Sequence, residues 1–271
     1  MKQNLTIVKV GGAVVEDEAQ LTLLLRNFAN IDGHKVLVHG GGRRATQVAA
    51  QLGIESKMVN GRRITDAEML RVVTMVYGGL VNKSLVARLQ AAGINALGIT
   101  GADMDVIRSH RRPPVAVTTE GSEPQKQLID FGFVGDVDRA DGQRLADLIN
   151  SGITPVVAPL THDGQGTILN TNADTIAATV AKALAPFFDV TLIYSFEKKG
   201  VLSRPDDDDS VIPVITPSLF DRYRADGTIS GGMLPKIENA LEAVGAGVER
   251  VIITQATAID GHHGTVIRQQ L

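Results

Sequence analysis

The stretch Leu5-Thr6-Ile7-Val8-Lys9-Val10-Gly11-Gly12 (residues 5–12, LTIVKVGG) places a mostly apolar, β-branched run directly before two glycines. Such a run predicts a buried strand that ends in a glycine turn. Residues 36–42, VLVHGGG, repeat the arrangement with three glycines. In a parallel sheet both turns lie at the carboxyl ends of the strands, where α/β proteins bind ligands. The two stretches therefore predict an α/β fold with a ligand site between the turns.

Short runs rich in Val and Ile alternate with segments of helical periodicity along the rest of the chain. This alternation predicts a mainly parallel central sheet with helices on both faces. We expect strands at residues 5–10, 35–38, 94–100, 154–158, 190–194 and 250–254. We expect helices at residues 18–30, 43–52, 67–91, 142–150, 172–185 and 232–244.

Two irregular segments divide this pattern. Residues 109–141 hold prolines, glycines and short alternating pieces at 115–118 and 131–137, which predicts a hairpin excursion that could close over a substrate. Ala185-Pro186 ends a predicted helix just before a strand, because a residue that precedes proline disfavours the helical region. We therefore expect two lobes, residues 1–186 and residues 187–271.

The composition limits the classes of partner. The chain has 271 residues, a formal net charge of −3 and no cysteine. A charge this small, spread over both signs, favours neither nucleic acid nor an anionic membrane. The absence of cysteine excludes disulfides, thiol nucleophiles and Cys-zinc sites. Without an apolar run of about 18 residues or a leader-like start, we expect a soluble cytoplasmic protein that acts on a small molecule.

Two lysines occupy positions at which a cation is unfavourable without an anionic partner. Lys9 interrupts the apolar strand just before its glycines, and a buried ammonium is costly unless a negative group, such as a phosphate, meets it. Lys236 falls in the first turn of the predicted helix 232–244, where the helix dipole disfavours a cation. Asp174 lies in the first turn of another predicted helix, so it is either a capping acid or the partner of these lysines.

Other motifs leave further interpretations open. Gly40, Gly42 and Ala45 satisfy the dinucleotide pattern G-x-G-x-x-A, although no strand-ending acid follows at about 20 residues. A nicotinamide-dependent oxidoreductase is therefore one alternative, and a binding module that senses an amino acid or nucleotide is another. The acidic run 206–209 and the pair His262-His263 favour solvated loops over metal sites, and the glycines alone explain the turn that follows His39.

Six motifs, taken in order, resemble the acetylglutamate kinases, a branch of the amino acid kinase family. They are Lys9-Val10-Gly11-Gly12, His39-Gly40-Gly41-Gly42, Asn60-Gly61-Arg62-Arg63-Ile64-Thr65, Asn82-Lys83, Asn170-Thr171-Asn172-Ala173-Asp174 and Gly232-Met233-Leu234-Pro235-Lys236. The resemblance implies an open αβα sandwich with an N-terminal lobe for the acyl amino acid and a C-terminal lobe for the nucleotide. It implies ATP-dependent phosphorylation of the γ-carboxylate of N-acetyl-L-glutamate in arginine biosynthesis.

Carried onto this chain, the resemblance implies a role for each site residue. Lys9 and Lys236 would hold the transferring phosphoryl group, and Asp174 would orient both lysines. Gly11 and Gly12 would cradle the phosphates of ATP, whose Mg²⁺ rides on the nucleotide without protein metal ligands. The substrate contacts would be Gly41, Gly42, Arg63 and Asn170. The chemistry agrees, because an ionised carboxylate needs no general base but does need its charge cancelled as it approaches a triphosphate.

The chain departs from the pattern of these kinases in two places. Residues 194–201, YSFEKKGV, stand where typical members have a short turn with an aspartate, which bears on the adenine and ribose contacts. The proline-rich residues 111–114 differ where these kinases close over the acyl group, so N-succinylglutamate is an alternative substrate. Glutamate, aspartate and carbamate are further acceptors within the family. Because the first strand begins at once, we expect a homodimer without strong feedback by arginine.

Overall fold

The computed structural model describes residues 2–118 and 126–270, and a single sheet of eight strands forms its centre. The strand order is β14-β16-β15-β13-β1-β2-β10-β5, and each pair is parallel except β15 with β16. All six predicted strands belong to it, as β1 (Gln3–Val10), β2 (His34–His39), β5 (Ala96–Ile99), β10 (Thr154–Val157), β13 (Phe188–Phe196) and β15 (Arg250–Gln255). Strands β14 (Val214–Ile215) and β16 (Thr265–Ile267) were not predicted.

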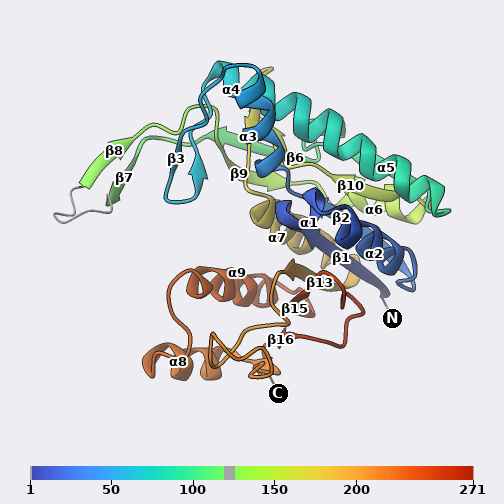
Figure 1. The fold of residues 1–271 in the computed structure, drawn as a ribbon. Helices are drawn as coiled ribbons and strands as arrows, with labels where there is room; N and C mark the ends of the chain where they lie inside the picture. The colour runs from blue at the N-terminus through green and yellow to red at the C-terminus, as the bar shows by residue number, and fades with distance from the viewer. Residues whose placement is uncertain (1, 119–125, 271) are drawn as a thin grey trace.

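Helices cover both faces of this sheet (Figure 1). One hydrophobic core contains side chains from α1 (Gly12–Glu16), α2 (Glu18–Ala29), α3 (Gly42–Gln51), α4 (Ala67–Val73) and α5 (Asn82–Ala91). The other takes up α6 (Gly142–Asn150), α7 (Ala173–Leu184), α8 (Pro217–Ala225) and α9 (Met233–Gly245). Within β1, Leu5 and Ile7 face the second core while Val8 and Val10 face the first. Both faces of the strand are therefore buried, and the predicted αβα sandwich is confirmed.

The predicted helix 67–91 is continuous but not uniform. Its middle, Thr74–Val81, is a π-helical segment between α4 and α5. π-helical turns are rare and often lie at functional sites. Here the segment carries Tyr77 and Val81 toward the glycine loop that follows β2.

The predicted excursion at residues 109–141 is confirmed as a set of antiparallel hairpins. Strand β6 (Ile107–Arg111) pairs with β9 (Gly135–Ala140), and β7 (Val115–Thr118) pairs with β8 (Lys126–Ile129) in an arm that extends from the body in Figure 1. The alternating segment predicted at residues 131–137 begins before β9, which starts at Gly135. With β11 (Leu160–His162) and β12 (Ile168–Asn170), β6 and β9 form a four-stranded sheet, and β3 (Met58–Val59) pairs with β4 (Arg62–Arg63).

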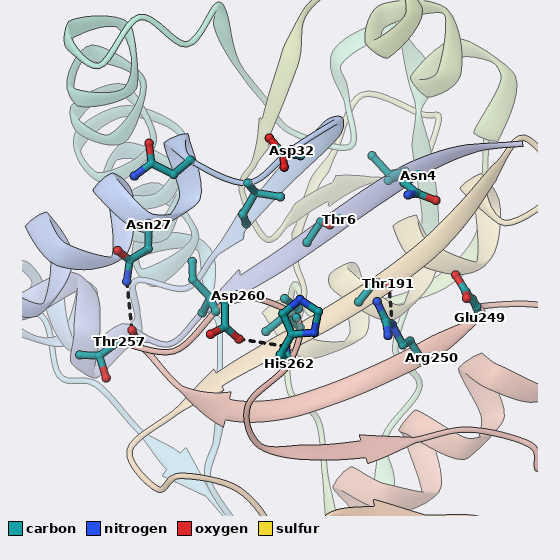
Figure 2. A pocket seen from close by; sticks show the side chains of 16 residues that line it. Asn4, Thr6, Asn27, Asp32, Thr191, Glu249, Arg250, Thr257, Asp260 and His262 are labelled. Carbon is teal, nitrogen blue, oxygen red and sulfur yellow. Dashed lines mark hydrogen bonds between the residues drawn. The ribbon is translucent and has the colours of Figure 1, made fainter. Parts of the chain in front are cut away.

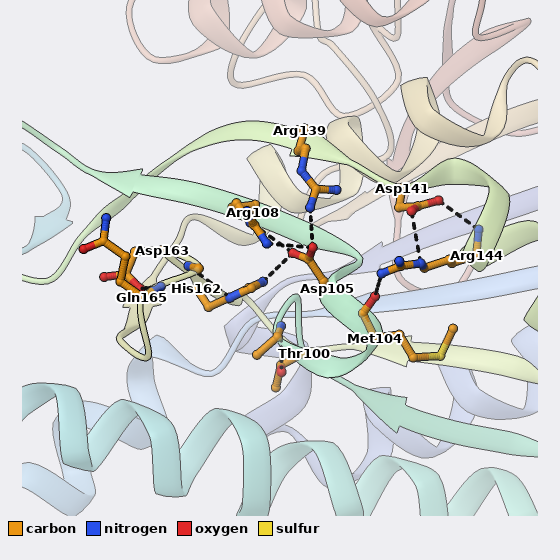
Figure 3. Close-up of polar contacts among 12 residues, drawn as sticks. Thr100, Met104, Asp105, Arg108, Arg139, Asp141, Arg144, His162, Asp163 and Gln165 are labelled. Carbon is orange, nitrogen blue, oxygen red and sulfur yellow. Dashed lines mark hydrogen bonds and ion pairs between the residues drawn. The ribbon is translucent and has the colours of Figure 1, made fainter.

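Asp105 joins three strands of the four-stranded sheet at one carboxylate (Figure 3). It accepts hydrogen bonds from Arg108 at 2.8 Å, from His162 at 2.8 Å and from Arg139. Burial acts to raise the pKa of Asp105, but these three donors outweigh it and lower the pKa to about 2. The carboxylate therefore stays charged at neutral pH and holds β6, β9 and β11 together.

The lobe boundary predicted at Pro186 falls between α7, which ends at Leu184, and β13, which begins at Phe188. Across this junction β13 pairs with β1 over eight residues, from Gln3 with Phe188 to Val10 with Ser195. The division into lobes stays a prediction, because the sheet runs through both parts of the chain. In the described residues, no helix has the length and apolar content needed to span a membrane.

Candidate active site

The two lysines and the aspartate singled out in the sequence lie together beyond the carboxyl ends of the parallel strands. Lys9 lies one residue before the end of β1, on the face covered by α7 and α9, and its Nζ lies 2.6 Å from Oδ1 of Asp174 on α7. The contact is an ion pair without the alignment of a hydrogen bond. Asn172, not Asp174, caps α7 by accepting from the backbone amides of residues 174 and 175. The structure thus favours Asp174 as the lysine partner over a capping acid.

Lys236 completes this group from the first turn of α9. Burial lowers the pKa of Lys236, and the charge of Asp174 opposes this effect. The charge of Lys9 lowers the pKa further, whereas that of Glu197 raises it. In the described part of the chain, its ammonium pairs with no carboxylate within salt-bridge distance and lies 4.1 Å from the centre of the Phe196 ring. Lys236 is therefore a partly desolvated cation whose charge is available to an anionic ligand.

The two glycine turns meet beside these charges. The amide of Gly40 donates to the carbonyl of Val10 at 3.1 Å. A Cβ atom built on Gly12 would lie 3.8 Å from the amide nitrogen of Gly42 and 3.9 Å from that of Gly41. Helix α3 begins at this point without a side-chain cap, so the backbone amides of Gly42 and the residues directly after it have no partner within the helix. Uncapped amides at a helix start bind anions, which supports the predicted contact of the Gly41-Gly42 loop with an anionic substrate.

Arg63 lies at the edge of the same loop, 8% exposed. Its guanidinium donates to the carbonyl of Gly42 at 2.9 Å, to the hydroxyl of Thr46 at 2.9 Å and to the hydroxyl of Ser56. These acceptors are all neutral, and no carboxylate of the described residues pairs with the guanidinium. A buried cation with only neutral partners is costly, so the site suits an anionic ligand such as a substrate carboxylate.

Asn170 lies near the same chain segment. It ends β12, and its side-chain amide donates to the hydroxyl of Thr65 at 2.9 Å while its backbone amide donates to Phe133. Because Thr65 is two residues from Arg63, the predicted substrate residues Gly41, Gly42, Arg63 and Asn170 fall on neighbouring segments. Thr65 belongs to the motif at residues 60–65 but was assigned no role, since a single threonine in a polar stretch carries no signal of its own.

His39 contacts the glycine loop from the buried side. It is fully buried; its Nδ1 donates to the carbonyl of Gly40 at 2.7 Å, and its Nε2 accepts from the amide of Asn82 at 3.1 Å. Burial lowers the pKa of His39 to about 4, the bond to Gly40 opposes this, and the charge of Lys83 adds to it. Both ring nitrogens are therefore engaged within the protein, and the neutral imidazole positions the loop.

Tyr77, on the π-helical segment, is a neighbour that the sequence did not reveal as part of the site. A Cβ atom on Gly41 would lie 2.9 Å from its ring, and its hydroxyl lies near Gly42. Burial raises the pKa of the Tyr77 hydroxyl, while nearby Arg63 acts to lower it. In the sequence Tyr77 is one apolar residue of a periodic helix, so only the fold shows its contact with the loop.

A cavity of about 600 Å³ lies elsewhere, toward the amino ends of β1, β13 and β15 (Figure 2). Its lining includes Thr6, Thr191 and Arg250, which are neighbours across the three strands. The Lys9 group, at the opposite ends of the strands, is therefore separate from it. The described residues contain no group of three or more histidine, aspartate or glutamate side chains placed to bind a metal.

The fold and the cationic, glycine-lined site define a small-molecule kinase. Residues 4–255 match the amino acid kinase family, and the chain belongs to that family. The acetylglutamate kinase of Bacteroides thetaiotaomicron is 64% identical over 99% of this chain and 100% of its own length. That of Phocaeicola vulgatus is 62% identical with the same coverage. The structure of smu.665 from Streptococcus mutans, 27% identical, superposes with a TM-score of 0.75 over 98% of this chain and 99% of its own.

Proposed function

We propose that this chain uses ATP to phosphorylate the γ-carboxylate of N-acetyl-L-glutamate, a step of arginine biosynthesis that takes place in the cytoplasm. Relatives that are more than 60% identical over nearly the whole chain are acetylglutamate kinases. The observation that carries the chemistry is the ion pair of Lys9 with Asp174 beside Lys236, which pairs with no carboxylate of the described residues. This arrangement supplies two cations at the mouth of a glycine cradle.

The transfer needs charge cancellation more than proton movement. An oxygen of the substrate carboxylate forms a bond to the γ-phosphorus while the bond from that phosphorus to the β,γ-bridging oxygen breaks, and ADP leaves with the electron pair. The carboxylate is already ionised at neutral pH, so no general base is required. Lys9 and Lys236 would stabilise the charge that spreads over the transferring group. Asp174 would keep Lys9 directed at it.

The two substrates would enter from the two sides of this group. The amides of Gly11 and Gly12, with Lys9 and Lys236, would hold the phosphates of ATP, and Mg²⁺ would arrive coordinated by the nucleotide. The amides of Gly41 and Gly42 would bind the substrate at the carboxylate that accepts the phosphoryl group. Arg63 would bind a carboxylate of the acyl amino acid, and Asn170 its amide end. Residues 1–186 would then form the amino acid lobe and residues 187–271 the nucleotide lobe.

The chain would act as a homodimer. Strand β5 lies at one edge of the eight-stranded sheet, and its Leu97 is 39% exposed. Leu80, on the long helix that packs beside this strand, is 55% exposed. An open strand edge and neighbouring apolar side chains are features that a second copy of the chain would cover.

The experiment that tests the proposal traps the acyl phosphate with hydroxylamine. Turnover of ATP with Mg²⁺ is measured with N-acetylglutamate, N-succinylglutamate, glutamate or aspartate as acceptor. We expect a hydroxamate only with an N-acylglutamate, and its identity fixes the acyl group. Lys236→Ala should lower turnover by several powers of ten, since it removes a cation that stabilises the transferring group. Lys182→Ala, which removes a half-exposed lysine paired with Glu242, is the matched control and should keep normal turnover.

A further inference from the structure

Two aromatic side chains on β13 flank the lysine group. Tyr194 pairs with Lys9 across the sheet, and Phe196 follows two residues later, so both project from the same face. Tyr194 is buried in the core under α7 and α9, and Phe196 packs against that core. The ring centres lie 6.3 Å apart with the planes inclined by 37°. These residues belong to the stretch 194–201, whose sequence departs from the pattern of the acetylglutamate kinases.

The ring of Phe196 contacts the ammonium group of Lys236. The Nζ atom lies 4.1 Å from the ring centre, within the range in which a cation is attracted to the face of an aromatic ring. The adjacent carboxylate, Glu197, is directed to Arg43 at 3.7 Å. Among the described residues, Lys236 makes no salt bridge, and its ammonium lies against this ring.

Tyr194 connects the same aromatic pair to the other side of the site. Its hydroxyl donates to the backbone carbonyl of Asp174 at 3.3 Å, in the first turn of α7. Burial and the nearby charge of Asp174 raise the pKa of the hydroxyl, which supports its role as a neutral donor. The pair therefore touches the helix that carries the acid and the side chain that carries the free cation.

We infer that Phe196, backed by Tyr194, is a positioning residue that holds the Lys236 ammonium toward the phosphoryl group through a cation–π contact. The inference rests on the function proposed above, in which Lys236 stabilises the transferring group. A lysine has a long flexible side chain, and here it stands in a helix turn whose dipole disfavours a cation. A carboxylate would fix it but would also neutralise it. A neutral ring fixes the ammonium and leaves its charge for the phosphate.

The test compares two substitutions at this position. Phe196→Leu keeps an apolar side chain but removes the aromatic face, whereas Phe196→Tyr keeps that face. In the hydroxamate assay we expect Phe196→Leu to lower kcat about tenfold with little change in KM for ATP, and Phe196→Tyr to restore most of it. Phe187→Leu, the same change at an exposed phenylalanine, is the matched control and should leave kcat unchanged. Normal kcat in Phe196→Leu, or a raised KM for ATP alone, would overturn the inference; the second would make Phe196 a contact of the nucleotide base.

A second readout does not depend on turnover. In lysine-labelled protein, the ring current of Phe196 should shift the NMR signal of the Lys236 Hε protons upfield, and Lys236→Arg identifies that signal by its loss. We expect the upfield shift to disappear in Phe196→Leu and to persist in Phe196→Tyr and Phe187→Leu. An unchanged signal in Phe196→Leu would contradict the positioning role. Wild-type protein without turnover on any acceptor would refute the proposed function, and the ring-current shift would still decide whether Phe196 holds Lys236.

Discussion

At the scale of the residue, Arg63 is the clearest sign of an anion-binding site, because its buried guanidinium bonds only to neutral acceptors among the described residues. We predict that Arg63→Gln raises KM for the acyl amino acid by about 10- to 100-fold, which corresponds to the loss of a charge-assisted hydrogen bond. The KM for ATP should change little. Steady-state kinetics with each substrate varied in turn measures both values.

The neighbouring Arg62 provides a matched control, because its side chain is exposed and Arg62→Gln removes the same charge. We expect its KM values to stay near those of the wild type. If Arg63→Gln raised the KM for ATP as much as that for the acceptor, Arg63 would not be a specific contact of the amino acid.

His39 predicts a pH dependence of stability. Its pKa is about 4 in the folded chain, against 6.5 for the free group, so between these values the unfolded state binds a proton that the folded state does not. Stability is full above pH 6.5 and falls by about 3 kcal/mol as the pH drops toward 4. Urea unfolding at several pH values measures this slope.

His39→Gln removes the titrating group, so its stability should fall less steeply over the same pH interval. His262→Gln, which changes an exposed histidine that makes no salt bridge among the described residues, should keep the wild-type slope. Equal slopes for His39→Gln and wild type would show that the buried imidazole is not the source of the acid sensitivity.

At the scale of the element, the glycine loop before α3 depends on its fit to the π-helical segment. A Cβ atom on Gly41 would come within 2.9 Å of the Tyr77 ring. We predict that Gly41→Ala displaces the loop and lowers kcat/KM about tenfold, in line with the cost of overpacking. Kinetics and thermal unfolding of the same variant separate the loss of activity from a loss of fold.

A smaller residue at position 77 should relieve this clash. The cost of Gly41→Ala should therefore shrink in a Tyr77→Leu background, as a double-mutant cycle measures. Gly79→Ala, in the same helical segment but with open space around its Cβ position, should leave activity unchanged. Additive effects of the changes at positions 41 and 77 would show that this contact is not the cause of the lower kcat/KM in Gly41→Ala.

Elements with strong periodicity could be predicted from the sequence, and others could not. The six strands with buried faces were found because their apolar runs precede glycines or alternate with helices. Strands β14 and β16 have two and three residues, too short for a periodic pattern to show. Lys9 could be singled out because it interrupts such a run, the glycines because they follow two of the runs, and Lys236 because the first turn of a helix disfavours a cation. Tyr77 and Phe196 could not, because apolar side chains at a site look like core residues in sequence.

At the scale of the whole molecule, the open edge at β5 bears on assembly. We predict a particle of twice the 28.8 kDa of one chain in light scattering after size exclusion. Leu80→Glu should shift the mass toward that of a single chain, because it places a charge in the apolar face. Leu128→Glu, at an exposed leucine of β8 on the arm, should not. A hexamer, or a dimer that Leu80→Glu leaves intact, would contradict this assignment of the interface.

The whole fold also explains why separate motifs form one site. Strands β1 and β2 are neighbours in register, Val10 with His39, so their glycine turns meet at one edge of the sheet. Helices α7 and α9 cover the same face of the sheet and bring Asp174 and Lys236 to Lys9. Residues more than 200 positions apart in the chain therefore meet in one cationic group, which favours a kinase over a module that only senses a ligand.

The most direct test of this account is the formation of a hydroxylamine-trapped acyl phosphate from ATP, Mg²⁺ and an N-acylglutamate by the wild-type protein. We predict a hydroxamate with N-acetylglutamate or its succinyl analogue and none with glutamate, aspartate or no acceptor. A protein that binds these ligands but forms no hydroxamate with any acceptor would contradict it.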